Sequence, residues 1–495
     1  MINYSIQELD MITELPEPII QHIMSFLTYK DAAKMSVLSK HFASAWNCFP
    51  SISFDETLNM GSCARLKGKP RLDKFLSYVS GFLSRRPPRI ALNIFCFSFN
   101  LEDSYEQPID SAIRYAIENK VKELKLDIVG RQKFKFQAHY NLPMKVFSAH
   151  SIAVLSLKGF MLEPPQNLTL ICPSIKELNL EKCKGMQTLK IAGEKFKIVV
   201  IELCQGLDKV EIDASNLESF SFGGEAHSSC RINLVTCKFL KYLSLRNAQV
   251  TDEWIKHEVA QFLRLEVLKL VYCMNSCSNS NLKTVELRNC FKLQKIEIYA
   301  RSLNTFAYGG DLKPSQVIIY SPCVHAKLSL RADRGLSDHW YKNLREFLAC
   351  FDHCKELEID CDMDMALIVP INVRKNLLAP LYDLNYLKVV TEQKPKNIND
   401  LVDGLMWLAP CLSKLSFISN CQEKSLKFEY DIARTIEDDL DCCKLRPIKC
   451  WRHSIRKVTM ENFEDCENMI LEKFLAESAL RLEATSREGN ACAEV

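Results

Sequence analysis

The segment CQGLDKVEIDASNLESFSFGGE at residues 204–225 returns in altered form at residues 290–311 as CFKLQKIEIYARSLNTFAYGGD. A constant shift aligns Cys204 with Cys290 and continues to match apolar residues with apolar residues through the final glycines, and an earlier copy begins at Cys183. Each copy presents apolar side chains on one side of a short strand and cannot enclose that side alone. The copies must therefore stack side by side to make a continuous core.

Further L-x-x-L-x-L segments flank these copies, and the pattern resembles that of leucine-rich repeats. The resemblance includes cysteines at the Asn/Cys position of the turn, namely Cys183, Cys273 and Cys290. Strand patterns at Ile201 and Ile212 lie too close together for a strand plus a helix, so we expect some coils to carry a strand on both faces and longer coils to carry a helix. The sequence predicts an α/β fold with an irregular solenoid over residues 111–430.

A different pattern occupies residues 15–46, LPEPIIQHIMSFLTYKDAAKMSVLSKHFASAW. Ile19, Ile23 and Phe26 have the spacing of one helix face, and prolines before them suit the first helical turn. Thr28 begins a weak capping pattern for a second helix, and the apolar spacing continues beyond it. Three short helices cannot bury a self-sufficient core, so we expect them to complete their folding against another surface.

These helices resemble an F-box, because the ordered Leu-Pro, Leu-Ser-Lys and Trp landmarks occur together. The resemblance implies a surface that docks on a Skp-type adaptor and, through it, on cullin and RING subunits of a ubiquitin ligase. The docking residues that it implies are Leu15, Pro16, Ile19, Ile20, Ile23, Phe26, Leu27, Asp31, Val37, Leu38, Ser39, Lys40 and Trp46.

The remaining boundaries follow from these two patterns. We assign residues 10–50 to the F-box, 51–110 to a connecting helix and strand, 111–430 to the solenoid and 445–485 to a C-terminal strand and helix. A predicted helix near residues 340–351 interrupts the solenoid between residues 335 and 380. The C-terminal segment resembles the FBD module of plant F-box/leucine-rich-repeat proteins, and we expect it to cap the last strand edge.

Composition narrows the function classes. The 64 Lys and Arg residues nearly balance 61 Asp and Glu residues, so nucleic acid binding is not indicated. The N-terminus has no basic and apolar leader, and no apolar run is long enough to cross a membrane, so we expect neither secretion nor a membrane partner. The 22 cysteines then belong in a reducing compartment, and we expect the chain in the nucleus, the cytoplasm or both.

Motifs for catalysis are missing from the sequence. It contains no G-x-S-x-G, Walker or G-x-G-x-x-G pattern, so we predict no catalytic residue and no cofactor. Cys350, His353 and Cys354 have irregular spacing for zinc ligands, and we predict no metal site.

The expected activity is therefore recognition of a target protein by the outward residues of the repeat strands. We nominate as target contacts Asn179, Glu211, Ser221, Ser244, Lys269, Glu286 and Glu297. Two other functions stay open: a co-receptor in which a small, hormone-like molecule completes the target surface, and a repeat scaffold unconnected with ubiquitin.

Overall fold

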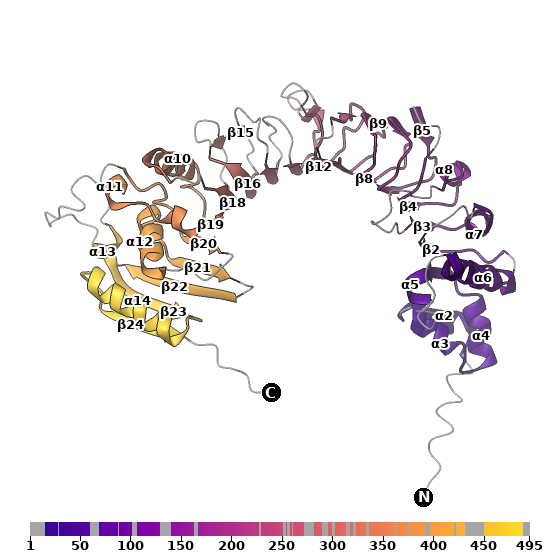
Figure 1. Ribbon diagram of the computed structural model, residues 1–495, viewed down its shortest axis with the longest axis horizontal. Helices are drawn as coiled ribbons and strands as arrows, with labels where there is room; N and C mark the ends of the chain where they lie inside the picture. The colour runs from indigo at the N-terminus through magenta and orange to yellow at the C-terminus, as the bar shows by residue number, and fades with distance from the viewer. Residues whose placement is uncertain are drawn as a thin grey trace, which may run out of the picture. The chain divides into compact units, whose positions relative to one another are not determined.

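A computed structural model shows two compact units, Met1–Leu240 (unit 1) and Lys241–Val495 (unit 2) (Figure 1). The structure describes residues 15–27, 29–59, 69–87, 89–100, 106–128, 140–162, 167–226, 229–250, 254, 258–259, 261–271, 282–289, 296–298, 302–312, 317–319, 323–332, 336–361, 363–374, 377–391, 397–419, 422–430 and 450–488.

Unit 1 begins with the expected short helices, α2 (Glu17–Ser25), α3 (Tyr29–Met35) and α4 (Lys40–Asn47). Pro16 stands at the start of α2, where its carbonyl accepts bonds from the amides of Ile19 and Ile20. The Ser39 hydroxyl accepts a bond from the Phe42 amide and caps α4.

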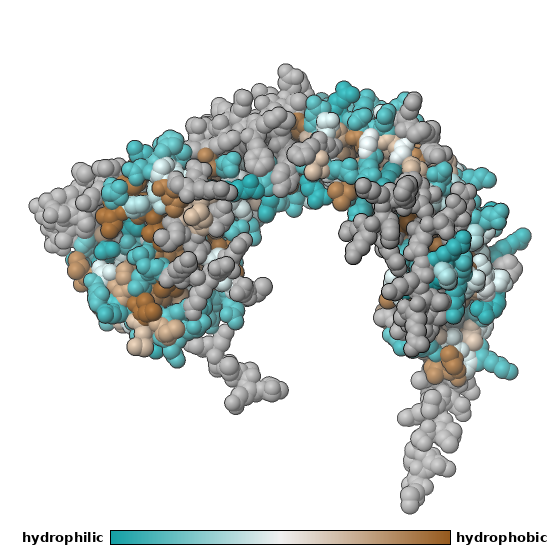
Figure 2. Space-filling model, viewed as in Figure 1, coloured by the Kyte–Doolittle hydropathy of each residue, from teal (hydrophilic) through white to brown (hydrophobic). Residues whose placement is uncertain are grey.

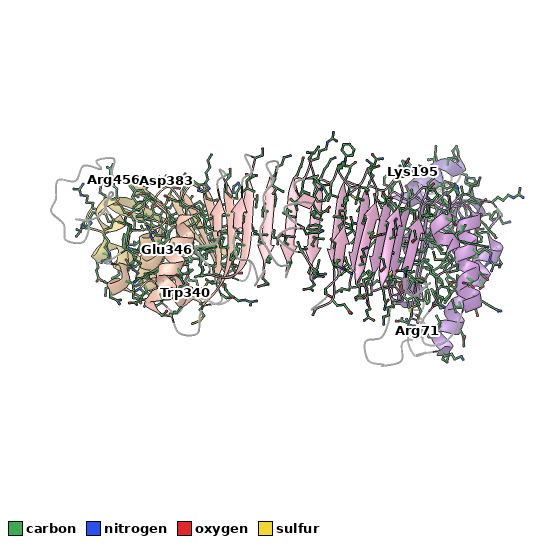
Figure 3. All side chains as sticks on the ribbon, turned by 90° about the horizontal axis from the view of Figure 1, so that it is seen from above. Arg71, Lys195, Trp340, Glu346, Asp383 and Arg456 are labelled. Atoms are coloured by element: carbon green, nitrogen blue, oxygen red, sulfur yellow. The ribbon has the colours of Figure 1, made fainter. Side chains whose placement is uncertain are left out.

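A parallel sheet forms the larger part of unit 1. Its strands pair in the order β1 (Ser51–Asp55), β2 (Ile94–Phe99), β3 (Glu123–Ile128), β4 (Val154–Lys158), β6 (Glu177–Glu181), β8 (Ile198–Glu202) and β10 (Ser219–Gly223). Buried and outward residues alternate along each strand, which gives one core face and one solvent-facing face. Figure 3 shows such strands lying side by side with side chains on both sides.

The side of the coils opposite the main sheet changes from helices to strands along unit 1. Helices α5 (Glu56–Asn59), α6 (Lys69–Arg85), α7 (Glu106–Glu118) and α8 (Lys145–Ser148) belong to the early coils. A second parallel sheet follows, with the strand order β5 (Asn167–Ile171), β7 (Thr188–Ala192), β9 (Lys209–Asp213) and β11 (Arg231–Asn233). The prediction that some coils carry a strand on both faces is confirmed.

The boundary predicted between a connecting segment and the solenoid is wrong. Strands β1 and β2 pair in register with β3, so the repeated architecture begins at Ser51 and not at residue 111. The buried residues of β1 and β2 include Phe54, Phe95 and Phe97 in place of leucine, which hides the repeat pattern in the sequence. The strand expected within residues 51–110 is found at Ile94–Phe99, and β1 adds a second strand to this segment.

Unit 2 contains a second run of parallel strands. They pair in the order β12 (Tyr242–Arg246), β13 (Val267–Val271), β14 (Thr284–Arg288), β16 (Thr305–Asp311), β18 (His325–Arg331), β19 (Glu356–Cys361), β20 (Tyr386–Val390) and β21 (Lys414–Ser419). Short strands β15 (Ile296–Ile298) and β17 (Val317–Ile319) pair separately. The longer coil between β12 and β13, where a helix is expected, lies partly outside the described residues.

The predicted interruption at residues 335–380 is also wrong, because β18, β19 and β20 pair consecutively in one sheet. Helix α10 (Asp338–Ala349) connects β18 to β19 and confirms the helix predicted near residues 340–351. The 3-10 helix η4 (Asp364–Leu367), α11 (Ile371–Arg374) and α12 (Ile398–Leu408) belong to the next coils. Longer connections here enclose helices without breaking the sheet.

The C-terminal strands extend the sheet instead of covering it. Strand β22 (Gln422–Tyr430) runs antiparallel to β21, β23 (Ile455–Glu461) runs antiparallel to β22, and β24 (Ala484–Glu488) runs parallel to β23. The expected C-terminal strand and helix are present as β23 and α14 (Asp465–Ser478), preceded by the short α13 (Trp451–Ser454). The cap therefore begins at β22, before the predicted residue 445.

A carboxylate joins this C-terminal part to the helices before it. Asp403 of α12 accepts hydrogen bonds from Arg374 Nη1 at 2.6 Å and from Arg452 Nη2 at 2.9 Å. The Arg374 guanidinium also stands 5.9 Å from the ring centroid of Trp407. One acidic residue thus holds together groups from α11, α12 and α13.

Cysteine thiols line the turns of the repeats in unit 1. Cys183 Sγ lies 3.6 Å from the carbonyl oxygen of Leu157, and Cys204 Sγ lies 3.5 Å from that of Leu180. Each thiol thereby reaches the preceding coil, as the Asn/Cys position of the repeat requires. Cys273 and Cys290 lie outside the described residues.

Candidate protein-docking surfaces

Exposed apolar residues gather on the N-terminal helices. Val37 and Phe26 are 85% and 77% exposed. We call the whole set the apolar docking surface, and it consists of Ile19, Phe26, Leu27, Val37 and Leu38. Figure 2 shows hydrophobic residues at the outer end of these helices. Since water-exposed apolar side chains of this size are costly in a cluster, the surface is suited to covering by another protein.

The other residues implied in docking differ in how far their side chains are exposed. Pro16 and Lys40 are exposed, and Leu15, Ile23 and Ser39 are half-buried. Asp31 accepts a hydrogen bond from Lys34 at 2.7 Å within α3. The Ser39 side chain caps α4, so its observed role is to hold the helix start.

Two of the implied docking residues are placed differently from the prediction. Ile20 and Trp46 are buried in the core of the N-terminal helices. The Trp46 ring stacks on Phe49 at 5.7 Å and meets Phe82 of α6 edge-on at 6.2 Å. Helical spacing alone cannot distinguish an apolar residue covered by its own chain from one left for a partner, which explains the error.

The same contacts show what completes the folding of the helices. Arg86 lies over the Phe82 ring at 5.9 Å, and its Nη2 donates to the carbonyl oxygen of Phe49 at 2.8 Å. Phe54 of β1 meets Phe82 edge-on at 5.4 Å. The surface that we expected the helices to need is therefore partly supplied by the first coil of their own unit. The helical spacing of residues 72–83 predicts the apolar face of α6 that includes Phe82, but it does not indicate that Phe82 packs against the N-terminal helices.

The nominated target contacts divide between sheets. Asn179 on β6 and Ser221 on β10 face outward on the main sheet of unit 1. Ser244, Lys269 and Glu286 have the same position on β12, β13 and β14 of unit 2.

Glu211 and Glu297 lie on strands outside the main sheets of the two units. Glu211 lies on β9 of the second sheet of unit 1, and Glu297 lies on β15, which pairs only with β17 among the described strands. Both were nominated because strands on the two sides of a coil have the same apolar alternation. Their nomination with residues of the main sheets is wrong.

Charged groups on the outward face of unit 2 pair across its strands. Glu286 accepts from Lys269 at 3.0 Å and from Arg288 at 2.7 Å, which lowers its pKa even though burial alone would raise it. Glu358 lies 3.2 Å from Lys327 and 3.9 Å from Lys388. These carboxylates are already neutralised within the unit.

The described residues contain no group of three side chains that could hold a metal ion, and no described helix has the length and apolar character needed to cross a membrane. Cys354 is buried, and Cys350 donates from Sγ to the Glu346 carbonyl oxygen at 3.6 Å. Cys354 therefore packs inside unit 2, and Cys350 bonds to the backbone of its own helix α10.

Comparisons with known proteins match both patterns. A family model described as the F-box domain matches residues 12–53, and a model described as the At1g61320/AtMIF1 LRR domain matches residues 166–234. The chain carries an F-box and leucine-rich repeats.

Relatives in Arabidopsis thaliana have the same combination in their names. The chain is 26% identical over 291 residues to "Putative F-box/LRR-repeat protein At3g18150", with 54% of this chain and 58% of the relative covered. It is 24% identical over 277 residues to "F-box/LRR-repeat protein 13", covering 53% and 56%. It is also 24% identical to "F-box/FBD/LRR-repeat protein At1g78750", covering 54% and 52%. The chain thus spans about half the length of the curated relatives it matches.

Proposed function

We propose that this chain is the substrate-recognition subunit of an SCF-type (Skp–cullin–F-box) ubiquitin ligase. The observation that carries the proposal is the apolar docking surface, which stays exposed on an F-box that buries Ile20, Phe42 and Trp46 in its own core. Docking there on a Skp-type adaptor connects the chain to cullin and RING subunits. The outward faces of the repeat strands then hold the target protein.

The chain contributes to ubiquitin transfer by position and not by chemistry. Holding the target beside the charged conjugating enzyme raises the effective concentration of its lysines, so no catalytic side chain of this chain is needed. We propose a non-catalytic subunit that acts in the nucleus, the cytoplasm or both, where free thiols persist. We further propose that β22 to β24 with α14 form an FBD-like module that ends the repeat sheet, a view supported by the name of the relative that contains FBD.

The test is co-purification of the full chain with a Skp-type adaptor. Replacing Phe26, Val37 and Leu38 together by alanine removes three exposed apolar side chains from the docking surface. Burying one such side chain contributes about 1.5–3 kcal/mol, so we expect adaptor affinity to fall by at least about a hundredfold.

The matched control is Leu58→Ala, which removes a side chain that is 74% exposed on α5, outside the docking surface. This variant should retain adaptor binding within about twofold, since surface substitutions of this kind have small effects. Full adaptor binding by the triple variant, or no binding by the unmodified chain, would refute the proposed function.

A further inference from the structure

The outward face of the main sheet in unit 1 has a row of carboxylates at the ends of its strands. Lateral pairing joins Asp55 to Ser98, Ser98 to Asp127, Asp127 to Lys158, Lys158 to Glu181 and Glu181 to Glu202. We call the four carboxylates of this series the acidic row: Asp55, Asp127, Glu181 and Glu202. Neighbouring strands in a sheet are about 4.8 Å apart, so the row is a continuous feature of the face.

Negative charge exceeds positive charge on this face. Its described outward residues also include Glu123 and Glu177, and the lysines among them are Lys125 and Lys158. Both lysines are already engaged, since Lys125 lies 2.6 Å from Glu123 and Lys158 lies 3.1 Å from Glu181. Lys182, directly after β6, is a third cation at this end of the sheet and lies 3.8 Å from Glu181. The remaining carboxylates give the face a negative potential that attracts cations.

Asp127, at the centre of the row, shows the effect of the neighbouring negative charges. Its Oδ1 is buried and has no hydrogen-bond donor among the described residues. Burial raises the pKa of Asp127, Lys158 and Lys182 oppose the rise, and the charges of Glu181 and Asp55 add to it. A further cation placed along the row would offset the repulsion between these carboxylates.

The rest of the face is suited to a polypeptide rather than to a small ion. Apolar Ile94, Val154 and Ile198 occupy the opposite ends of their strands, and Ser156 and Asn179 lie between them and the acidic row. Glu123 and Glu177 alternate with these apolar residues along the same edge. A segment lying across these strands would therefore meet alternating apolar and acidic groups along one edge and the acidic row along the other.

The two units differ in the balance of charge on their outward faces. The outward residues of the described main-sheet strands include seven Lys and Arg residues and five Asp and Glu residues in unit 2, against two lysines and six carboxylates in unit 1. Charge complementarity therefore selects unit 1 as the binding face for a cationic partner.

We propose that the main sheet face of unit 1 binds a Lys- and Arg-rich segment of the target protein, with the acidic row contacting its basic side chains. This inference rests on the proposed function, because it names the chemistry of the target that the ligase subunit recognises. It commits to a basic polypeptide as the occupant.

The experiment measures binding of a fluorescein-labelled alternating Lys-Ser peptide to the full chain, co-expressed with a Skp-type adaptor, by fluorescence anisotropy. An alternating Glu-Ser peptide of equal length is the control ligand. We expect the Lys-Ser peptide to bind at least about tenfold more tightly, and the difference to shrink as salt screens the charges.

Two sets of substitutions locate the binding. The unit 1 variant combines Asp127→Asn, Glu181→Gln and Glu202→Gln, and we expect it to bind the Lys-Ser peptide about tenfold more weakly. The matched unit 2 variant combines Glu286→Gln, Glu356→Gln and Glu358→Gln, and it should bind within about twofold of the unmodified chain. If the unit 1 variant does not fold, the single exposed substitution Glu177→Lys, which reverses one charge of the face, should still weaken binding by more than the roughly twofold range allowed for the unit 2 variant.

Equal affinity for both peptides, or equal losses in the unit 1 and unit 2 variants, would overturn the inference. Adaptor co-purification is measured on the same samples and should be unchanged in all of them. Loss of Lys-Ser preference with adaptor binding intact rejects the basic target alone, whereas Lys-Ser binding without adaptor binding rejects the proposed ligase function.

Discussion

Asp403→Asn should loosen the C-terminal part of unit 2. The Asp403 side chain is only 13% exposed and that of Arg374 only 11%, whereas Arg452 is 43% exposed. Removing the carboxylate charge leaves the buried Arg374 guanidinium without its counterion, and Arg452 loses a weaker, partly solvated contact. Removing one partner of a buried ion pair costs about 3–5 kcal/mol.

Asparagine keeps the shape of the side chain and one acceptor oxygen, so we expect the low end of that range, about 3 kcal/mol. The assay is hydrogen exchange of the backbone amides in β23 and α14, because it reports the opening of this part of the chain separately from the rest. A loss of about 3 kcal/mol corresponds to exchange that is about a hundredfold faster.

Two controls accompany this variant. Glu477→Gln disrupts the exposed pair with Lys473, whose charged atoms lie 4.0 Å apart, and should change exchange by less than about twofold. Combining Arg374→Met with Asp403→Leu replaces the buried pair by apolar side chains and should recover much of the loss. Exchange in Asp403→Asn within about threefold of the unmodified chain would show that Asp403 does not hold these elements together.

Two further predictions concern individual positions. Leu203 has a φ of +53°, a conformation that asparagine adopts more readily and that Asn247 adopts after β12, so Leu203→Asn should stabilise unit 1 by about 0.5–1 kcal/mol in urea unfolding. Leu203→Ala keeps the strain and should not stabilise, and a more stable alanine variant would contradict the argument. A hydrogen bond from Ser416, with further bonds from Lys414 and Tyr386, lowers the pKa of Glu423 to about 2. Because this pKa lies below its ordinary value, the ionised carboxylate stabilises unit 2 at neutral pH, and this stabilisation is lost as the pH falls toward 2. Glu423→Gln should therefore make the free energy of unfolding less sensitive to acid. An unchanged dependence of unfolding on pH would refute the assignment.

Local spacing in the sequence determined the elements that repeat. Alternating apolar residues such as Leu178 and Leu180 could only be buried on one side of a strand, and the helical spacing from Ile19 to Phe26 could only make one apolar face. These inferences need no knowledge of distant residues, because strand and helix periodicities are properties of the adjacent chain. They predicted the stacked repeats, the N-terminal helices and strands on both sides of some coils.

Only the tertiary structure decided which of these residues are covered and which share a face. Trp46 is buried because Phe82 from a later helix reaches it, while Val37 in the same motif stays exposed. Glu211 and Ser221 have the same local pattern but lie on different sheets. Asp127 joins the acidic row through strand pairing with residues far along the chain. Contacts of this kind depend on how the connections bring distant coils into register, which the spacing of neighbouring residues does not specify.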